Sequence, residues 1–162
     1  MRIRLGAWVA AFGLLAGISG CGGDAVGPTG PAREATQAAP TKDAVIGLLR
    51  DLLAALEAGD ADRAVGLLVP FPGGGSEEGK AAVAALLERR EISARGIDRL
   101  AAGGRYGSLK EVFPDRGETW ARQAGVDPEK CVGLGLEGAE VAVHWGGDRL
   151  RLLRVDDVGK LE

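Results

Sequence analysis

The sequence predicts an α+β domain in which helices come first and antiparallel strands come last. Apolar residues recur at helical spacing between residues 41 and 124, which is the pattern of amphipathic helices. Between residues 131 and 156 the period changes to two, because apolar residues alternate with small or polar ones. Helical segments that precede the strands, rather than alternating with them, favour the α+β class.

About five helices, several of them short, are expected. Thr41 is placed to cap the first helix, which Gly59 ends. Asp60 is placed to cap the second helix, which stops before Pro70. Ser76 is placed to cap the third, and two glutamates in its first turn suit the positive end of the helix dipole.

Shorter helical segments follow these three. A fourth helix is expected over residues 94–102 and another over 118–124. Between them, Ser108 and Glu111 have the spacing of a capping box, which predicts a helical turn before Pro114.

The last third of the chain predicts a three-stranded antiparallel meander. Apolar residues stand at every second position in its three runs: Val132, Leu134 and Leu136; Val141, Val143 and Trp145; Leu150 and Leu152. Residues 146–148 are Gly-Gly-Asp, which tolerate the positive φ of a tight hairpin turn. The third run ends near Asp156.

Composition excludes two classes of function. The 162 residues include 20 Lys and Arg against 23 Asp and Glu, so the formal net charge is −3. A nucleic-acid-binding domain normally has a basic face, so no nucleic-acid partner is expected. Two cysteines and one histidine are too few for a Cys/His zinc cluster, and we expect no metal or other cofactor.

The N-terminus has the organisation of an export signal. Arg2 and Arg4 precede 14 uncharged residues, 5–18, and small residues follow. Residues 18–21, Ile-Ser-Gly-Cys, resemble the lipobox of bacterial lipoproteins. The resemblance implies that residues 1–20 are a signal peptide removed before Cys21, and that Cys21 carries the lipid. Two alternatives to the lipobox remain. A permanent membrane helix would need about 20 apolar residues, more than the 14 of this stretch. An ordinary signal peptide would be cut after residue 20 and leave Cys21 without lipid.

The resemblance also implies a location. A lipid at Cys21 would hold the protein on a membrane of the cell envelope. In related lipoproteins an Asp after the Cys favours the inner membrane, and Gly22 stands there instead, which favours the outer membrane if the host has one. Residues 21–40 are rich in Gly, Pro and Ala, so we expect a disordered tether. A single α+β domain is then expected over residues 41–162.

Residues 55–68, ALEAGDADRAVGLL, resemble two kinds of helix pair. One opens the cone-shaped α+β fold of proteins similar to nuclear transport factor 2. The other occurs in tetratricopeptide repeats, but the period of about 34 residues that such an array requires is absent from this sequence. No functional residue is carried over from either family.

Two glycine patterns match nucleotide-binding motifs in spacing only. Residues 74–80 have the spacing of a P-loop, but Ala81 stands where a Ser or Thr should hold magnesium. Residues 133–138 match G-x-G-x-x-G, but a strand rather than a helix is expected after them. A loop that enters a helix and a strand that ends in a turn explain the two patterns.

Few residues are candidates for chemistry. His144 is the single histidine, so acid–base catalysis by histidine would depend on it. Its alternation places it on the strand face opposite Val143 and Trp145. Cys131 is expected to be a buried apolar group rather than a reactive thiol. Adjacent Asp156 and Asp157 would point to opposite faces of a strand and so could not easily share a metal ion.

The aromatic residues of the domain allow two interpretations. They can pack the helices against the sheet, or some of them can line a small-ligand pocket. The residues of that speculative pocket are His144, Trp145, Tyr106 and Trp120.

The preferred interpretation is a lipid-anchored, non-enzymatic envelope protein whose domain binds a protein or peptide partner. One alternative is a pocketed α+β module that binds a small ligand or performs weak acid–base chemistry through His144. The other is a purely structural lipoprotein.

Overall fold

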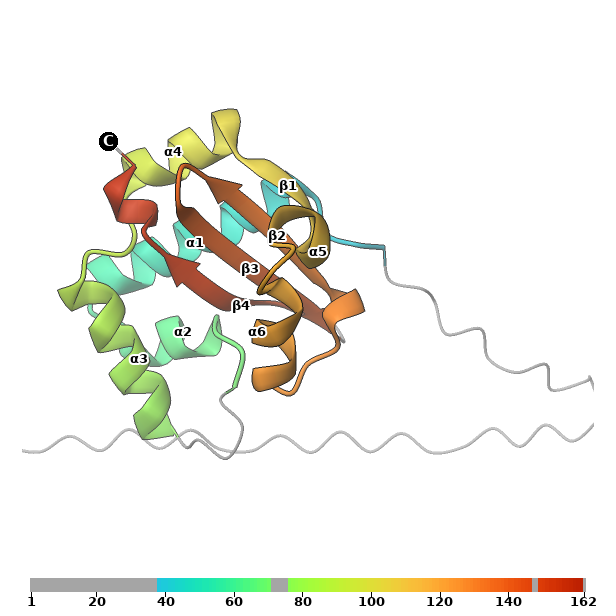
Figure 1. Ribbon diagram of the computed structural model, residues 1–162. Helices are drawn as coiled ribbons and strands as arrows, with labels where there is room; N and C mark the ends of the chain where they lie inside the picture. The colour runs from blue at the N-terminus through green and yellow to red at the C-terminus, as the bar shows by residue number, and fades with distance from the viewer. Residues whose placement is uncertain (1–37, 71–75, 147–148, 162) are drawn as a thin grey trace, which may run out of the picture. The chain divides into compact units, whose positions relative to one another are not determined.

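The computed structural model describes residues 38–70, 76–146 and 149–161. The expected signal peptide, Cys21 and most of the expected tether lie outside these residues. The described part is an α+β structure with six α-helices and a four-stranded antiparallel sheet (Figure 1). The predicted class is confirmed, but the predicted number of strands was one too low.

Four helices precede the sheet: α1 (Lys42–Glu57), α2 (Ala61–Gly66), α3 (Ser76–Glu88) and α4 (Ala94–Gly103). The Thr41 hydroxyl accepts a hydrogen bond from the Ala44 amide at 3.2 Å, and the Asp60 carboxylate accepts one from the Arg63 amide at 3.0 Å. Both predicted caps are therefore confirmed. The side chain of Ser76 lies outside the description, so its cap stays a prediction.

The strand that the sequence analysis missed is β1 (Arg105–Ser108). It has four residues, Arg-Tyr-Gly-Ser, of which only Tyr106 favours strands. Pairing with a later strand, rather than local preference, makes it a strand. Next come α5 (Leu109–Val112), α6 (Gly117–Gln123) and the 3-10 turn η1 (Pro128–Lys130). The predicted capping box between Ser108 and Glu111 is confirmed at the start of α5.

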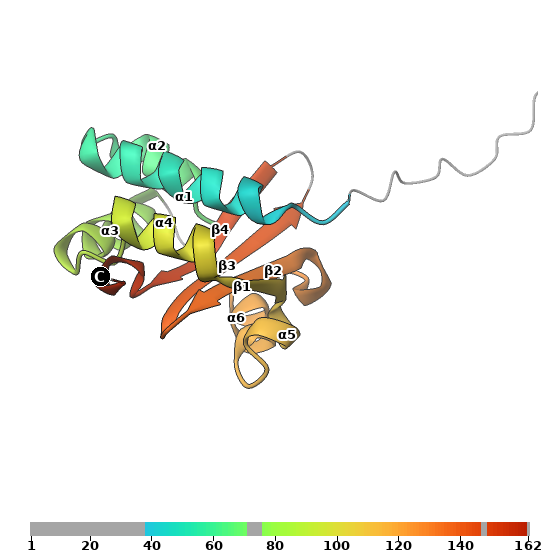
Figure 2. The same ribbon diagram turned by 90° about the horizontal axis from the view of Figure 1, so that it is seen from above.

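The sheet is completed by β2 (Cys131–Leu136), β3 (Ala139–Gly146) and β4 (Arg149–Asp156), and the turn η2 (Val158–Lys160) follows. Its strand order is β1-β2-β3-β4, with every neighbouring pair antiparallel. Seen from above, α1 and α4 cover one face of the sheet, and α5 and α6 cover the other (Figure 2).

Each face of the sheet has its own apolar cluster. The larger cluster joins α1, α3 and α4 to the sheet and includes the fully buried Leu49, Leu100 and Leu134. The smaller cluster lies under α5 and α6 and includes Phe113 and Ala142. Strand alternation divides the side chains between them.

The G-x-G-x-x-G pattern is explained by packing on this second face. A side-chain carbon at Gly133 would lie 2.9 Å from both Phe113 and Val112, so the bare backbone lets α5 approach β2. Gly138, with φ +95°, completes the turn between β2 and β3. As expected, a strand and a turn account for the pattern.

Candidate functional site

One of the described cavities is a groove beside β4, between α3 and α6. Its volume is about 520 Å³. Its wall is mainly apolar and includes Leu68, Val69, Leu86, Leu152, Leu153 and Val155. Arg89, Trp120, Gln123 and Arg154 add polar groups to the same wall. An apolar hollow with a few polar groups is the usual form of a ligand site.

The groove exists because α3 packs on α2 at a close approach. A side-chain carbon at Gly79 would lie 2.8 Å from the Val65 side chain, and Val83 fixes the middle of α3 in the larger core. Leu86, further along α3, reaches the groove. In Figure 1, the segment that follows α2 ends between α3 and α6.

That segment pairs with β4. Leu68 forms an isolated parallel bridge with Leu152. The Val69 amide donates to the Leu152 carbonyl at 2.8 Å, and the Leu152 amide donates to the Leu67 carbonyl at 2.8 Å. The outer edge of β4 is therefore paired at Leu152, and the pairing in the described residues ends at Val69.

An ion-pair cluster holds the α6 wall of the groove. Glu140 on β3 is only 4% exposed, and its carboxylate accepts hydrogen bonds from Arg116 and from Arg154. Arg154 also donates to Asp156 at 2.5 Å.

The two guanidinium groups of this cluster also contact Trp120. They lie 5.5 Å (Arg116) and 4.7 Å (Arg154) from the centre of the ring, within the range of cation–π attraction. The ring is also tilted against Phe113, with centroids 5.1 Å apart. Trp120 is therefore fixed as a wall of the groove by contacts on several sides.

Arg89 differs from Arg154 in having no side-chain partner in the part of the chain that the structure describes. It lies near the end of α3 and lines the groove. Among the described residues, no hydrogen bond or ion pair engages its side chain. The charge of Arg154 is balanced by Glu140 and Asp156, so Arg89 is the cation in the groove wall that lacks a described counter-charge.

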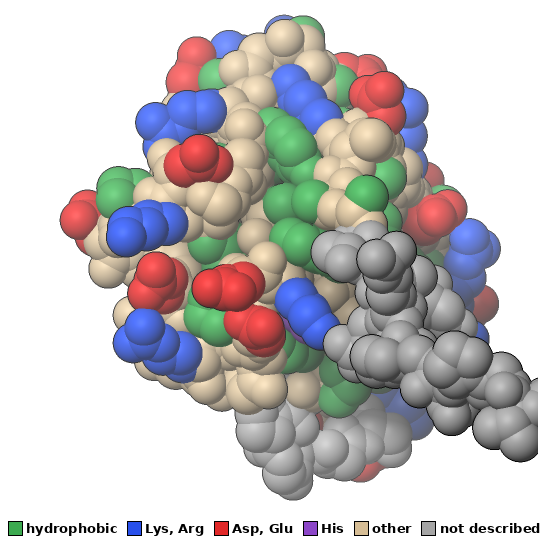
Figure 3. All heavy atoms as spheres, turned by 90° about the vertical axis from the view of Figure 1, so that its right-hand side faces the viewer, with side chains coloured by type: hydrophobic (Ala, Val, Ile, Leu, Met, Phe, Trp, Pro, Cys, Tyr) green, Lys and Arg blue, Asp and Glu red, His purple; other side chains and the backbone are tan. Residues whose placement is uncertain are grey.

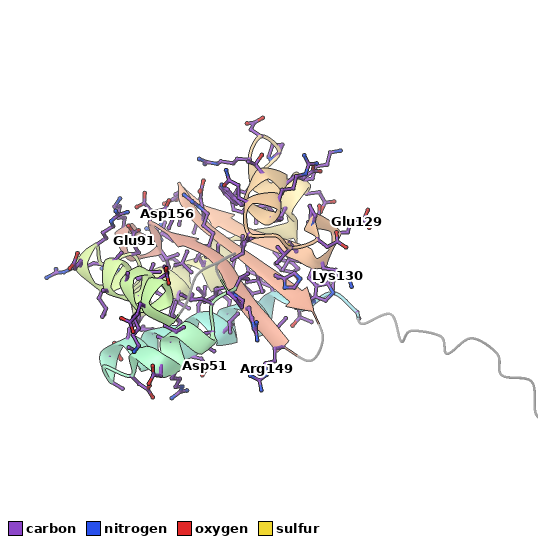
Figure 4. The ribbon with its side chains drawn as sticks, turned by 90° about the horizontal axis from the view of Figure 1, so that it is seen from below. Asp51, Glu91, Glu129, Lys130, Arg149 and Asp156 are labelled. Carbon is purple, nitrogen blue, oxygen red and sulfur yellow. The ribbon has the colours of Figure 1, made fainter. Side chains whose placement is uncertain are left out.

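The groove continues toward an acidic cluster. A smaller cavity of about 170 Å³ shares Arg89, Arg154 and Val155 with it and also contacts Glu91 and Asp156. Figure 4 shows Glu91 and Asp156 at the same end of the sheet, with Lys130 and Arg149 toward the other.

Oxygen atoms of Glu91, Asp156 and Asp157 lie within 4.8 Å of one another. The expectation that adjacent aspartates diverge was wrong here, because β4 ends at Asp156 and Asp157 has φ +56°. Each carboxylate already has a protein partner: the Asp157 amide donates to Glu91, Arg154 pairs with Asp156 and Lys160 with Asp157. These contacts explain the cluster as a tie between the β4 end and the segment before α4.

His144 does not line the groove, its smaller extension or the third described cavity, a hollow beside α1 and α3. It is paired across the sheet with Cys131 on one side and Arg151 on the other. Burial lowers the pKa of His144, and the charges of Lys130 and Arg151 lower it further, against the opposing effect of Asp127.

Cys131 is buried, as the sequence predicted. Burial raises the pKa of its thiol to about 12, and the charge of Asp127 adds to the rise. Its sulfur donates to the Asp127 carbonyl at 3.3 Å. A thiol that stays protonated is a poor nucleophile, so the neighbouring pair Cys131 and His144 is not arranged as an activated dyad.

The four residues of the speculative pocket do not meet. Tyr106 and Trp145 pack against the larger core, on the α1 side of the sheet, and the Tyr106 hydroxyl donates to the Pro40 carbonyl. Trp120 packs against the smaller core, on the opposite side. Of the four residues, Trp120 lines the groove. The groove itself was not predicted, because it depends on the packing of α3 relative to β4, which the sequence pattern does not determine.

Comparisons with protein-family models, with curated proteins and with solved structures found no match to this chain. The lipobox resemblance and the similarity of residues 55–68 to known helix pairs therefore stay predictions. Within the described residues, no helix is both long enough and apolar enough to cross a membrane.

Proposed function

We propose that this chain is a lipid-anchored protein of the bacterial cell envelope whose domain binds a partner in the groove beside β4, without catalysing a reaction there. The groove is the observation that carries the binding role. Its wall is mainly apolar and contains the fixed ring of Trp120 and the cation Arg89, which has no counter-charge among the described residues. Such a wall supplies contact area and one charge for recognition.

The side chains of the groove support binding rather than bond-breaking chemistry. The described lining contains no Ser, Thr, Cys, His or Lys, which are common nucleophiles and bases. The buried Glu140 nearby is engaged by two arginines and is therefore not available as a base.

The location in the envelope rests on the sequence of residues 1–21. Its first test is the intact mass of the protein purified from membranes of its native host. The expected mass begins at Cys21 and includes a diacylglycerol and an acyl chain. A mass that begins at Cys21 without lipid, or recovery only from the soluble fraction, would contradict the anchor.

The binding role is tested separately by photocrosslinking in cells. A photoreactive benzoylphenylalanine replaces Ala82 or Ala85, both in the groove wall on α3, or Ala54, an exposed residue of α1 outside the described cavities. We expect a discrete adduct from the groove positions and none from Ala54. Equal labelling at all three positions, or no adduct from the groove, would contradict a binding role for the groove.

A second control position for the crosslinking experiment lies at the end of α4, just before β1. The face in Figure 3 has a central band of apolar side chains with charged ones around it. Tyr106 on β1 is half-buried and packs against the larger core. A photoreactive group at Ala102, exposed at the end of α4, would detect binding outside the groove, and the proposal expects no adduct there.

A further inference from the structure

Among the described residues, the backbone of Val155 has no partner on the outer edge of β4. The amide and carbonyl of Leu152 face outward, because both bond to the segment 67–69. Leu152 is the β4 neighbour of Val143, so the backbone of Val143 faces β2 instead, and so does that of Val141 two residues away. Val155 is the β4 neighbour of Val141, and its own amide and carbonyl must therefore face outward.

This outward backbone lies in the groove. Val155 lines both the main cavity and its smaller extension. The irregularity in register between Ala142 and Val143 accounts for the three-residue interval between Leu152 and Val155. Within the described residues, no backbone or side-chain group outside the sheet bonds to Val155. An unpaired strand edge of this kind is a template for another strand.

Pairing at Leu152 demonstrates that this edge accepts a strand. The segment 67–69 uses both outward groups of Leu152, and its described pairing stops at Val69. Beyond it, the same edge has Val155 with apolar side chains around it, including Leu86 and Leu153, and with Arg89 at the end of α3. The site therefore offers one donor, one acceptor, an apolar surface and one cation.

We propose that the groove binds an extended segment of another polypeptide, which adds as a strand at Val155 and places an acidic side chain against Arg89. This rests on the proposed binding role and names its ligand class. A lipid chain would fill the apolar wall but would leave the Val155 amide and carbonyl without partners. An extended peptide satisfies both by β-augmentation.

The test uses the mature lipidated protein in phosphatidylethanolamine nanodiscs. The probes are fluorescent twelve-residue peptides in which Val or Ile alternates with Ser or Thr and one Glu occupies each polar position in turn. Matched peptides carry Gln instead of Glu. Two further sets carry N-methyl groups on the odd-numbered or on the even-numbered amides, so that each set blocks one edge of the peptide strand. We expect the Glu peptides to bind, and the Gln peptides and one of the two N-methylated sets to bind about tenfold more weakly.

Variants locate the bound strand. Val155→Pro removes the outward amide at a position where an edge strand tolerates proline, and should weaken binding by about tenfold. Val155→Thr keeps the amide and should bind as the parent does. Arg89→Gln should abolish the preference for Glu over Gln peptides, whereas Arg95→Gln, the same charge change at another exposed site, should leave it intact.

Amide hydrogen exchange gives a readout that does not depend on a variant. Exchange at Val155 should slow by about tenfold or more when a Glu peptide binds. If no peptide binds, or if exchange at Val155 is unchanged in the complex, the β-augmentation proposal is wrong. If sodium palmitate then blocks groove crosslinking at Ala85 while peptides do not, the binding role of the groove stands and the ligand class is a lipid.

Discussion

Arg154 on β4 and Glu140 on β3 form an ion pair across the sheet, with the Arg154 Nε atom 3.2 Å from a Glu140 carboxylate oxygen. The carboxylate is 4% exposed, and Arg116 from the other side of the cluster donates to its second oxygen. A buried carboxylate is tolerated only with such partners. Arg116, the residue before α6, therefore ties the sheet to α6 through Glu140. Arg116 and Arg154 together fix the ring of Trp120 in the groove wall.

Glu140→Gln is expected to lower the free energy of unfolding by roughly 2 kcal/mol, because a neutral amide cannot replace a charged acceptor shared by two guanidinium groups. Urea unfolding measures the loss. Glu137→Gln is the matched control, since Glu137 is exposed and pairs with the partly exposed Arg99. Its cost should stay below about 1 kcal/mol. Equal losses in the two variants would show that burial of the Glu140 pair contributes nothing extra.

Gly133→Ala is expected to destabilise the domain by about 1–3 kcal/mol, because the added carbon would lie 2.9 Å from Phe113 and Val112. Gly47→Ala is the matched change in the middle of α1, where the added carbon meets nothing within 4 Å. Alanine should stabilise that helix by about 0.5–1 kcal/mol. Thermal unfolding compares the two, and a Gly133→Ala domain as stable as the parent would refute the packing explanation of the glycine pattern.

Local signals in the sequence predicted much of the fold. The caps at Thr41 and Asp60 and the capping box at Ser108 depend on residues within one helical turn, so the sequence contains all the information they need. The face of His144 was also predictable, because strand alternation alone determines it.

Longer-range features could not be read in the same way. β1 depends on Tyr106 pairing with Leu134, 28 positions later, and its sequence has little strand preference of its own. Because β1 was not predicted, the face of the sheet on which Tyr106 lies could not be predicted either. The groove depends on the Leu68–Leu152 bridge and on the close approach of Gly79 to Val65, neither of which has a sequence signature.

His144 predicts how stability depends on pH. Its pKa in the folded protein lies below the ordinary value of 6.5 because burial and the charges of Lys130 and Arg151 disfavour the imidazolium. The unfolded chain therefore binds more protons than the folded one as the pH falls through 6.5, and the contribution of His144 to stability is lost progressively below that value.

A histidine NMR titration should give a midpoint below 6.5. Unfolding measured at about pH 7.5 and about pH 5.5 should give a smaller pH dependence for His144→Gln than for the parent, since His144 is the single histidine. A midpoint at or above 6.5 would mean that the imidazole is more solvated, or closer to a carboxylate, than the structure places it.

Cys131 is expected to resist alkylation in the folded protein. Burial raises the pKa of its thiol to about 12, so the thiolate that reacts with iodoacetamide is scarce at about pH 8. A chain with Cys21→Ser makes Cys131 the single thiol, and mass spectrometry follows its modification over time. The same chain in concentrated urea is the control and should react fully, because unfolding returns the thiol to its ordinary pKa. Rapid alkylation of the folded chain would mean that Cys131 opens to solvent, and would make the pair of Cys131 and His144 a candidate for chemistry after all.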